Sequence, residues 1–204
     1  MSSDEERNLR WHGGQVSRDQ RAEVLGHKAA CIWLTGLSGS GKSTLARRLE
    51  DVLVASGVHA YVLDGDNLRM GLNRDLGFSA ADRRENIRRV SELARLLVDS
   101  GTIVICAFIS PFRADRAAAR ELLGEDFIEV FVDARLEVCE ERDPKNLYQR
   151  ARSGEIEEFT GISSPYEEPT SAELWLDTAT ESVGACTNQV LVFLHGRDLI
   201  TYSP

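Results

Sequence analysis

Residues 31–43 read CIWLTGLSGSGKS, and this stretch decides the fold. Its first five residues form a short apolar run of the kind found in buried parallel strands. The remainder matches the pattern G-x-x-x-x-G-K-[ST], a loop whose glycines let the backbone approach a polyphosphate closely. Apolar residues with helical spacing follow the loop, at Leu45, Leu49, Val52 and Leu53. A strand, this loop and a helix, in that order, predict a site for a nucleoside triphosphate.

The residues of the loop indicate how ATP would bind. Backbone N–H groups of the loop and of the helix N-terminus supply positive potential to the phosphates. Lys42, one of only three lysines in the chain, can reach the β- and γ-phosphates, and the Ser43 hydroxyl can ligate Mg²⁺. We therefore expect ATP, with Mg²⁺, to contact Gly36, Leu37, Ser38, Gly39, Ser40, Gly41, Lys42, Ser43 and Thr44.

Apolar runs alternate with stretches of helical spacing through the rest of the chain. We expect further strands at 61–63, 103–109, 127–132 and 174–176. We expect helices at 79–101, with Ser79 as its cap, at 111–123, from Asp143-Pro144 to near Gly154, and at 181–195. This alternation predicts an α/β fold, a P-loop NTPase-type parallel sheet of about five strands with helices on both faces. Ligands of such sheets bind beyond the carboxyl ends of the strands.

Composition limits the partners and the compartment. The 204 residues include 24 Lys and Arg against 33 Asp and Glu, a net charge of −9, which argues against nucleic acid or an anionic membrane as a partner. The acidic N-terminus lacks the apolar core of a signal peptide, and the longest apolar run, 103–109, is too short to cross a bilayer. Four scattered cysteines are typical of reduced, buried thiols. We expect a soluble, cytoplasmic protein.

An arginine-rich stretch narrows the choice among P-loop proteins. The GTPase signature N-K-x-D is absent, and the chain is short for a motor domain. Residues 69–95 hold seven arginines against four acidic residues. We expect Arg88, Arg89 and Arg95 to form ion pairs on a solvated helix face. Arg69 and Arg83 lie where a guanidinium fork could hold an anionic acceptor, which favours a small-molecule kinase.

Longer strings then identify a family. They read DGDNLR at 64–69, GLNRDLGFS at 71–79, DRRENIRR at 82–89, FISPFR at 108–113, FVD at 131–133, RDPK at 142–145, FTGI at 159–162 and PYE at 165–167. Together they resemble the adenylylsulfate (APS) kinase family from about residue 11 to residue 169. The resemblance implies transfer of the γ-phosphoryl group of ATP to the 3′-hydroxyl of adenylyl sulfate. The products would be ADP and 3′-phosphoadenylyl sulfate, in the activation step of sulfate assimilation.

The resemblance also implies roles for single residues. Asp64, at the end of the second strand, can accept the 3′-hydroxyl proton or hold Mg²⁺ through water, so Ser43 and Asp64 form the expected metal site. Lys42 and Ser110 complete the catalytic set. Ser110 occupies the family's phosphoserine position, but direct in-line transfer needs no covalent intermediate, and its role stays open. The implied acceptor contacts are Asp66, Arg69, Phe78, Arg83, Asn86, Ile109, Ser110, Lys145 and Phe159.

Two phenylalanines in that set resemble the family's clamp for the acceptor adenine. Phe78 and Phe159 are each flanked by glycine or polar residues, which favours exposed positions for both. Stacking between two aromatic rings stabilises a bound base by about 1–3 kcal/mol per base in single-strand binders.

We divide the chain into an N-terminal extension, 1–27, and a P-loop kinase domain, 28–204. Within the domain, the polar segment 142–169 is expected to be a lid that closes over the nucleotides and excludes water. Lys145 and either Arg150 or Arg152 would then approach the phosphates. The family usually has Gly in place of Asn146 and often Lys in place of Gln149, so the lid contacts are open.

Other hypotheses remain. The acceptor could be another nucleotide or a small alcohol, or the chain could be a non-catalytic regulatory module or a P-loop switch. The intact Gly41-Lys42-Ser43 sequence and Asp64 argue against lost catalysis. The resemblance further implies a homodimer and a functional link to ATP sulfurylase. Because the length holds one kinase domain and no fused sulfurylase, we expect a stand-alone enzyme.

Overall fold

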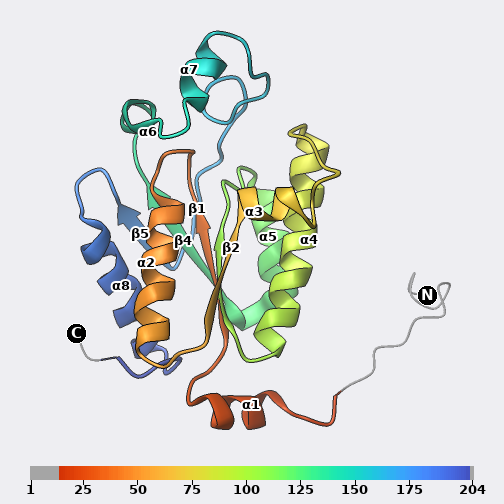
Figure 1. The fold of residues 1–204 in the computed structure, drawn as a ribbon, viewed down its shortest axis with the longest axis vertical. Helices are drawn as coiled ribbons and strands as arrows, with labels where there is room; N and C mark the ends of the chain where they lie inside the picture. Colours follow the sequence, from red (N-terminus) through yellow and green to blue (C-terminus); the bar gives the residue numbers. More distant parts are fainter. Residues whose placement is uncertain (1–13, 203–204) are drawn as a thin grey trace, which may run out of the picture.

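The core of the protein is a five-stranded parallel sheet with the strand order β2-β3-β1-β4-β5 (Figure 1). The computed structural model describes residues 14–202. The strands are β1 (Ala30–Thr35), β2 (Ala60–Asp64), β3 (Ile103–Ala107), β4 (Phe127–Asp133) and β5 (Leu174–Asp177). The expected α/β class and the number of strands are confirmed.

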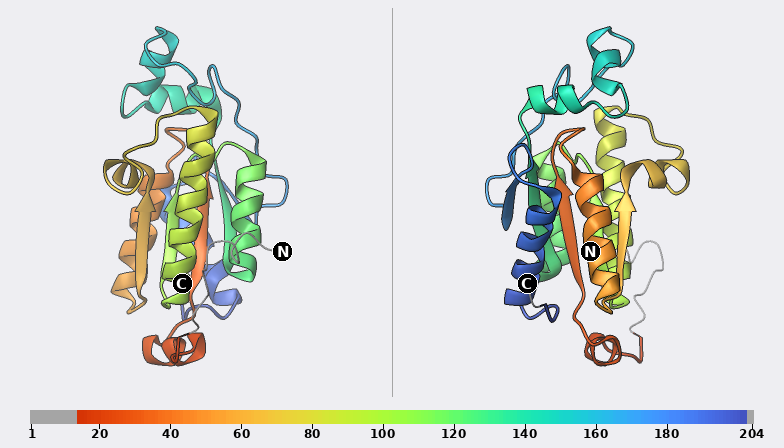
Figure 2. Two further views of the ribbon diagram at one scale, coloured as in Figure 1. Left: turned by 90° about the vertical axis from the view of Figure 1, so that its right-hand side faces the viewer. Right: turned by 60° about the vertical axis from the view of Figure 1, so that its left-hand side comes forward.

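Helices cover both faces of this sheet, as expected. They are α1 (Arg18–Leu25), α2 (Lys42–Ala55), α3 (Gly65–Met70), α4 (Ala80–Asp99), α5 (Arg113–Leu123), α6 (Leu136–Arg142), α7 (Leu147–Arg152) and α8 (Val183–Gly196), with a 3₁₀ turn at Gly124–Asp126. Helices α2 and α8 lie on one face and α4 and α5 on the other (Figure 1, Figure 2).

The central strand β1 explains why both faces are covered. All six of its residues are buried, so successive side chains must pack into two different layers. Ile32 and Leu34 join the core cluster that includes α2 and α8, whereas Cys31 and Trp33 join the cluster that includes α4 and α5. The near-continuous apolar run of β1 is the direct cause of this central position.

The parallel strands bring their carboxyl ends to one edge of the sheet. The short helices α6 and α7 lie beyond that edge, and α1 lies at the opposite end of the molecule (Figure 1, Figure 2). Ser79 caps α4 as expected, because its hydroxyl accepts a hydrogen bond from the Asp82 N–H at 3.2 Å. Because the carboxyl ends of the parallel strands share one edge, the loops that follow β1, β2, β3 and β4 all lie at that edge.

One helix expectation was wrong in its boundaries. The helix expected from Asp143-Pro144 begins only at Leu147, and α6 precedes it. Asn146 takes a left-handed backbone at φ +53°, which separates the two helices. Asp143 still caps the second helix, since its carboxylate accepts from the Leu147 and Gln149 N–H groups at 2.8 and 3.1 Å.

Part of the expected N-terminal extension is ordered. Helix α1 begins with a capping box formed by Ser17 and Gln20, and Arg18 pairs with Asp126 at 2.9 Å. Residues 1–13 lie outside the described part of the chain. Between residues 14 and 202, no helix is both long and apolar enough to cross a bilayer.

The four cysteines are free and buried, as expected. Cys31 and Cys106 lie on neighbouring strands with their sulfur atoms 3.8 Å apart. Burial raises the pKa of Cys106 well above its ordinary value. A thiol held in its neutral form by an apolar environment is chemically inert, so Cys106 serves packing.

Candidate active site

The phosphate loop connects the end of β1 to the start of α2. Gly36 lies so close to β4 that a Cβ atom there would come within 2.4 Å of the Val132 carbonyl oxygen. Gly39 adopts φ +77°, and its Cβ would meet the Cys139 carbonyl oxygen at 2.8 Å. Only glycine fits these two positions, because other residues would clash with backbone atoms. The loop glycines noted in the sequence are thus required by the surrounding structure.

Lys42 folds back over this loop. Its ammonium donates to the carbonyl oxygens of Gly36 and Leu37 at 2.9 and 2.6 Å. Burial lowers the pKa of Lys42 to about 8, and the ammonium of Lys145 contributes to the lowering. A buried, poorly solvated cation encircled by loop backbone is well placed to attract a polyphosphate.

The next residue joins the phosphate loop to a second strand. The Ser43 hydroxyl donates to Asp64 Oδ2 at 2.8 Å, and Asp64 Oδ1 accepts from the Asp66 N–H at 3.0 Å. Asp64 is 9 % exposed and ends β2 while also capping α3. A hydroxyl and a carboxylate at hydrogen-bond distance are the hard oxygen donors that Mg²⁺ prefers. No cluster of three or more His, Cys, Asp or Glu side chains suited to a metal occurs among residues 14–202.

A group of acceptor candidates surrounds Phe78. This ring is 60 % exposed, in agreement with expectation. The Arg69 guanidinium lies over it, 4.4 Å from the centroid, and that of Arg83 lies at 5.8 Å. Arg69 also donates to the carbonyl oxygens of Leu76 and Gly77, at 3.2 and 2.8 Å. The two arginines therefore meet at one exposed aromatic surface, as a site for an anionic, flat ligand requires.

The expected exposure of Phe159 was wrong. Phe159 is only 7 % exposed and packs edge-on against Tyr148, with ring centroids 5.0 Å apart. It belongs to a small apolar core shared by α6, α7 and the residues that follow. Flanking polar residues misled the prediction, because burial here is created by a helix eleven residues earlier. Its contact with the acceptor stays a prediction.

Several contacts join the segment 142–169 to the rest of the site. Lys145 forms an ion pair with Asp66, and Arg83 donates to the Glu158 carbonyl oxygen at 2.7 Å. Tyr148 donates to the Ser38 carbonyl oxygen of the phosphate loop at 2.9 Å. This segment therefore contacts the phosphate loop as well as Asp66 and Arg83, and its closure as a lid stays a prediction.

Arg150 and Arg152, one of which is expected to approach the phosphates when the lid closes, both form ion pairs here, and that approach stays a prediction. Arg150 pairs with Glu155 at 3.2 Å, and Arg152 pairs with Glu140 at 2.5 Å. The pair of Arg150 lies within the segment 142–169, whereas Glu140 lies on α6, just before that segment. Arg142, which belongs to the RDPK string but was given no role of its own, donates to the Thr178 carbonyl oxygen at 2.5 Å and to that of Gly39 at 3.4 Å. Only the contact with Gly39, 103 residues away, reveals its place at the phosphate loop.

The remaining acceptor candidates are more deeply buried. Asn86, in the N-terminal half of α4, accepts a hydrogen bond from the Asn73 side-chain amide at 3.0 Å. Ser110 follows β3 and is 2 % exposed, and its hydroxyl accepts from Trp33 Nε1 at 3.1 Å. Ile109 lies beside the end of β1, where its carbonyl oxygen accepts from the Thr35 hydroxyl at 2.8 Å.

The solvated arginines of α4 are as predicted. Arg88 pairs with Glu85 at 2.7 Å, and Arg89 pairs with both Glu85 and Asp75. Arg95 pairs with Glu92 at 3.2 Å. These side chains engage each other along the outer face of the helix, so they are not placed to hold an acceptor.

The strand ends thus bring together a phosphate loop, a hydroxyl paired with a carboxylate, and arginines beside an exposed ring, and the segment 142–169 contacts this site. Transfer of a phosphoryl group depends chiefly on positioning and on neutralising charge, and this arrangement offers both. The fold and the site together define a kinase of the P-loop class.

The chain belongs to the adenylylsulphate kinase family, whose model matches residues 28–177. It is similar to the adenylyl-sulfate kinase of Aeromonas hydrophila, with 58 % identity over 95 % of this chain and 98 % of that protein. The adenylyl-sulfate kinase of Staphylococcus haemolyticus is 52 % identical over the same shares. Like these relatives, the chain is an ATP-dependent kinase.

A solved structure agrees with this placement. The Mycobacterium tuberculosis APS kinase CysC, in complex with AMPPNP and APS, superposes with a TM-score of 0.80 at 50 % identity. The match covers 83 % of this chain and 99 % of that one. The five-stranded sheet and its helices are therefore those of a P-loop kinase of this family.

Proposed function

We propose that this chain transfers the γ-phosphoryl group of ATP to the 3′-hydroxyl of adenylyl sulfate and releases ADP and 3′-phosphoadenylyl sulfate. The observation that carries the proposal is the hydrogen bond of 2.8 Å between Ser43 and Asp64. It places the nucleotide loop directly beside the DGDNLR segment. The membership of the family, and not the geometry, supplies the identity of the acceptor.

The acceptor would lie between the end of β2 and the start of α4. Asp64 can accept the proton of the attacking hydroxyl as the new O–P bond forms and the bond to the ADP oxygen breaks. Arg69 and Arg83 would hold the phosphosulfate, and Phe78 would stack on the adenine. Displacement of the Arg69 guanidinium from the Phe78 ring would free that face for the base.

The donor side would be held by the phosphate loop. Lys42 would leave the Gly36 and Leu37 carbonyl oxygens to bind the transferring phosphoryl group. Ser43 and Asp64 fit Mg²⁺, which typically takes one or two protein oxygens and completes its shell with water and phosphate. The ion would neutralise charge on the phosphates.

The lid would enclose both nucleotides. Lys145 already reaches across the site to Asp66, and it would exchange that carboxylate for an anionic group of the acceptor. Enclosure excludes water, so hydrolysis of ATP would not compete with transfer. Ile109, Ser110 and Asn86 would line the acceptor side, and Phe159 would close it if the lid repacks around Tyr148.

ADP release tests the proposal. Purified protein with ATP and Mg²⁺ should produce ADP rapidly only when adenylyl sulfate is present, with one 3′-phosphoadenylyl sulfate formed per ADP. Equal turnover with AMP, or with a small alcohol, would contradict adenylyl sulfate as the specific acceptor. Turnover that needs no acceptor would identify an ATPase instead.

The homodimer and the functional link to ATP sulfurylase are also proposals. Light scattering of the purified chain would give its mass, and a mass equal to that of a single chain would rule out the dimer. A functional link to a sulfurylase is tested by mixing the two enzymes. The overall rate of 3′-phosphoadenylyl sulfate formation should then exceed the rate calculated from the kinetic constants of each enzyme measured alone. The proposed activity depends on neither result.

A further inference from the structure

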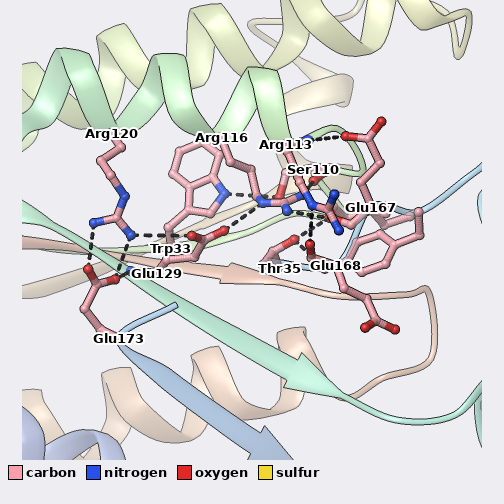
Figure 3. A network of polar contacts seen from close by, with 12 residues as sticks. Trp33, Thr35, Ser110, Arg113, Arg116, Arg120, Glu129, Glu167, Glu168 and Glu173 are labelled. Carbon is pink, nitrogen blue, oxygen red and sulfur yellow. Dashed lines mark hydrogen bonds and ion pairs between the residues drawn. The ribbon is translucent and has the colours of Figure 1, made fainter. Parts of the chain in front are cut away.

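A buried network of arginine and glutamate side chains lies behind the loop that follows β3 (Figure 3). We call residues 108–112 the acceptor loop. Arg116, on α5, is 2 % exposed, and its Nε donates to Oε1 of the buried Glu129 on β4 at 2.7 Å. Of its other two nitrogens, Nη1 reaches the acceptor loop and Nη2 reaches Glu167 (Figure 3).

Three successive carbonyl groups of the acceptor loop each receive a donor from a different part of the chain. The Ile109 oxygen accepts from the Thr35 hydroxyl of β1 at 2.8 Å. The Ser110 oxygen accepts from Arg116 Nη1 at 2.7 Å. The Pro111 oxygen accepts from the Glu167 N–H at 2.8 Å. The path of this loop is therefore imposed by its surroundings, with Arg116 holding its middle.

The middle residue needs such support. Ser110 has φ +40°, a left-handed conformation that costs a non-glycine residue of the order of 1–3 kcal/mol and persists only where neighbouring groups enforce it. Arg116 donates a hydrogen bond to the Ser110 carbonyl oxygen, and Trp33 Nε1 donates to the Ser110 hydroxyl at 3.1 Å. Backbone and side chain of Ser110 are thereby held at the same time.

The same arginine reaches the end of the lid. Its Nη2 donates to the Glu167 carbonyl oxygen at 2.7 Å. Glu167 in turn accepts the Arg113 N–H at 2.7 Å through its carboxylate, and so caps α5, whose own N-cap residue offers no side-chain bond. Arg113 Nε donates to the Glu168 carbonyl oxygen at 2.6 Å. The lid exit, residues 167–168, is thus fastened to the acceptor loop.

A contribution to the stability of the folded protein explains the buried Arg116–Glu129 pair only weakly. The desolvation of a buried ion pair usually offsets its attraction, and apolar pairs of similar volume are often as stable. Lysine could replace the charge of Arg116 but not its planar fork of donors. What the guanidinium adds is the joining of three places: β4, the carbonyl of Ser110 and the lid exit.

We propose that Arg116 is a positioning residue, which fixes the left-handed Ser110 and the lid exit in one arrangement so that the acceptor loop fits the acceptor. This inference rests on the proposed function, since it concerns the acceptor side of the same site. Arg116 touches no substrate group in this role. Its loss should affect use of adenylyl sulfate and leave ATP binding largely unchanged.

The test compares the loss of Arg116 together with its partner Glu129 with the loss of Arg120, which lies on the same helix as Arg116. Arg116→Met with Glu129→Met removes the buried pair without leaving a lone charge. Arg120→Met is the matched control, because Arg120 also pairs with Glu129 and with Glu173 but its described bonds do not reach the acceptor loop or the lid exit. We expect kcat/KM for adenylyl sulfate to fall about tenfold to hundredfold in the double variant, with KM for ATP within twofold. Arg120→Met should keep both values within twofold of the wild type.

A spectroscopic readout separates positioning from simple loss of stability. The indole N–H resonance of Trp33, assigned by its disappearance in Trp33→Phe, should shift in the double variant and stay in place in Arg120→Met. If the double variant does not fold, Arg116→Lys decides, because it keeps the charge pair and should still lower kcat/KM for the acceptor. An unchanged acceptor kcat/KM, or equal losses for ATP and acceptor, overturns the inference. Wild-type turnover, measured in the same series, tests the proposed function separately.

Discussion

Ser43 and Asp64 share a hydrogen bond of 2.8 Å although they follow strands that are not neighbours in the sheet. Strand β3 lies between β1 and β2, and the contact is made across it because α2, which begins at Lys42, packs against β2. The bond connects the group that would hold the donor to the group that would activate the acceptor. The two halves of the site are thereby set at a defined separation.

Removal of either partner of this bond should show that they act together. We expect Asp64→Asn and Ser43→Ala each to lower kcat by about a hundredfold or more, because a base and a metal ligand are lost. The double variant should lose much less than the product of the two factors, as groups acting as a unit do. Rate measurements over a range of Mg²⁺ concentrations give these values. Ser43→Thr, which keeps the hydroxyl, is the control, and strictly multiplicative losses would contradict the idea.

The depressed pKa of Lys42 makes a prediction about stability. With a pKa of about 8 in the folded protein, against 10.5 for the free side chain, the unfolded chain binds more protons between these values. Stability from this group therefore rises with pH, by about 2 kcal/mol from pH 7 to pH 9.5.

Urea unfolding without nucleotide measures this effect as a difference between wild type and Lys42→Met, since other titrating groups cancel. The variant should be the more stable protein at pH 7, and its advantage should shrink by about 2 kcal/mol at pH 9.5. The same variant should lose at least a hundredfold in kcat, because the charge facing the phosphoryl group is gone. A pH-independent difference in stability would contradict the buried state of Lys42.

The two phenylalanines should behave in opposite ways. Phe78 is exposed, so Phe78→Ala should leave the free energy of unfolding within about 0.5 kcal/mol while lowering kcat/KM for adenylyl sulfate. Stacking of about 1–3 kcal/mol corresponds to a factor of roughly 5 to 150. Phe159 is buried against Tyr148, so Phe159→Ala should destabilise the protein by about 3–5 kcal/mol if the lid unfolds with the rest. Denaturant titrations and acceptor kinetics distinguish the two, and equal stabilities would show that Phe159 is not buried in solution.

The ion pair between Lys145 and Asp66 should matter for binding and little for stability. Both side chains are more than half exposed, and such pairs contribute about 0–1 kcal/mol. We expect Lys145→Met to leave the melting temperature nearly unchanged and to raise KM for adenylyl sulfate about tenfold. The increase should be smaller at high salt, where the charge is screened.

Arg152→Met is the control for the lid, because Arg152 belongs to the same segment as Lys145 and forms an exposed ion pair, with Glu140 of α6, away from Asp66. That variant should keep KM for adenylyl sulfate close to the wild-type value. If both variants raise KM equally, the effect belongs to the lid as a whole and not to Lys145.

Much of the fold could be predicted because local signals and tertiary demands agree. The apolar run at β1, the glycine loop and the spacing of α2 appear within 25 residues, and Ser79 caps the helix it was expected to cap. The helix at 143–154 was harder, because Asn146 takes a left-handed backbone that helix rules do not anticipate. The carboxylate of Asp143, four residues before the helix start, then substitutes for an adjacent cap.

Some of the residues of the candidate site could be predicted from the sequence. Lys42, Ser43 and Asp64 stand in motifs whose chemistry is local, and the structure places them together. The contacts of Arg142 and Arg116 carry no such signal, since each residue reaches a backbone carbonyl group far away in the chain, Gly39 for Arg142 and Glu167 for Arg116. The burial of Phe159 was missed for the same reason, because flanking residues report sequence neighbours and not packing.

The amino-acid sequence by itself determined the sheet, the phosphate loop and the class of chemistry, because strand runs, glycines and a lysine act over a few residues. Only the tertiary structure decided how the acceptor loop is held. The carbonyl groups of the left-handed Ser110 and of its two neighbours accept from Arg116, Thr35 and Glu167, three donors that lie far apart along the chain. Hydrogen bonds between such distant groups exist only once the core has packed, so no local pattern encodes them.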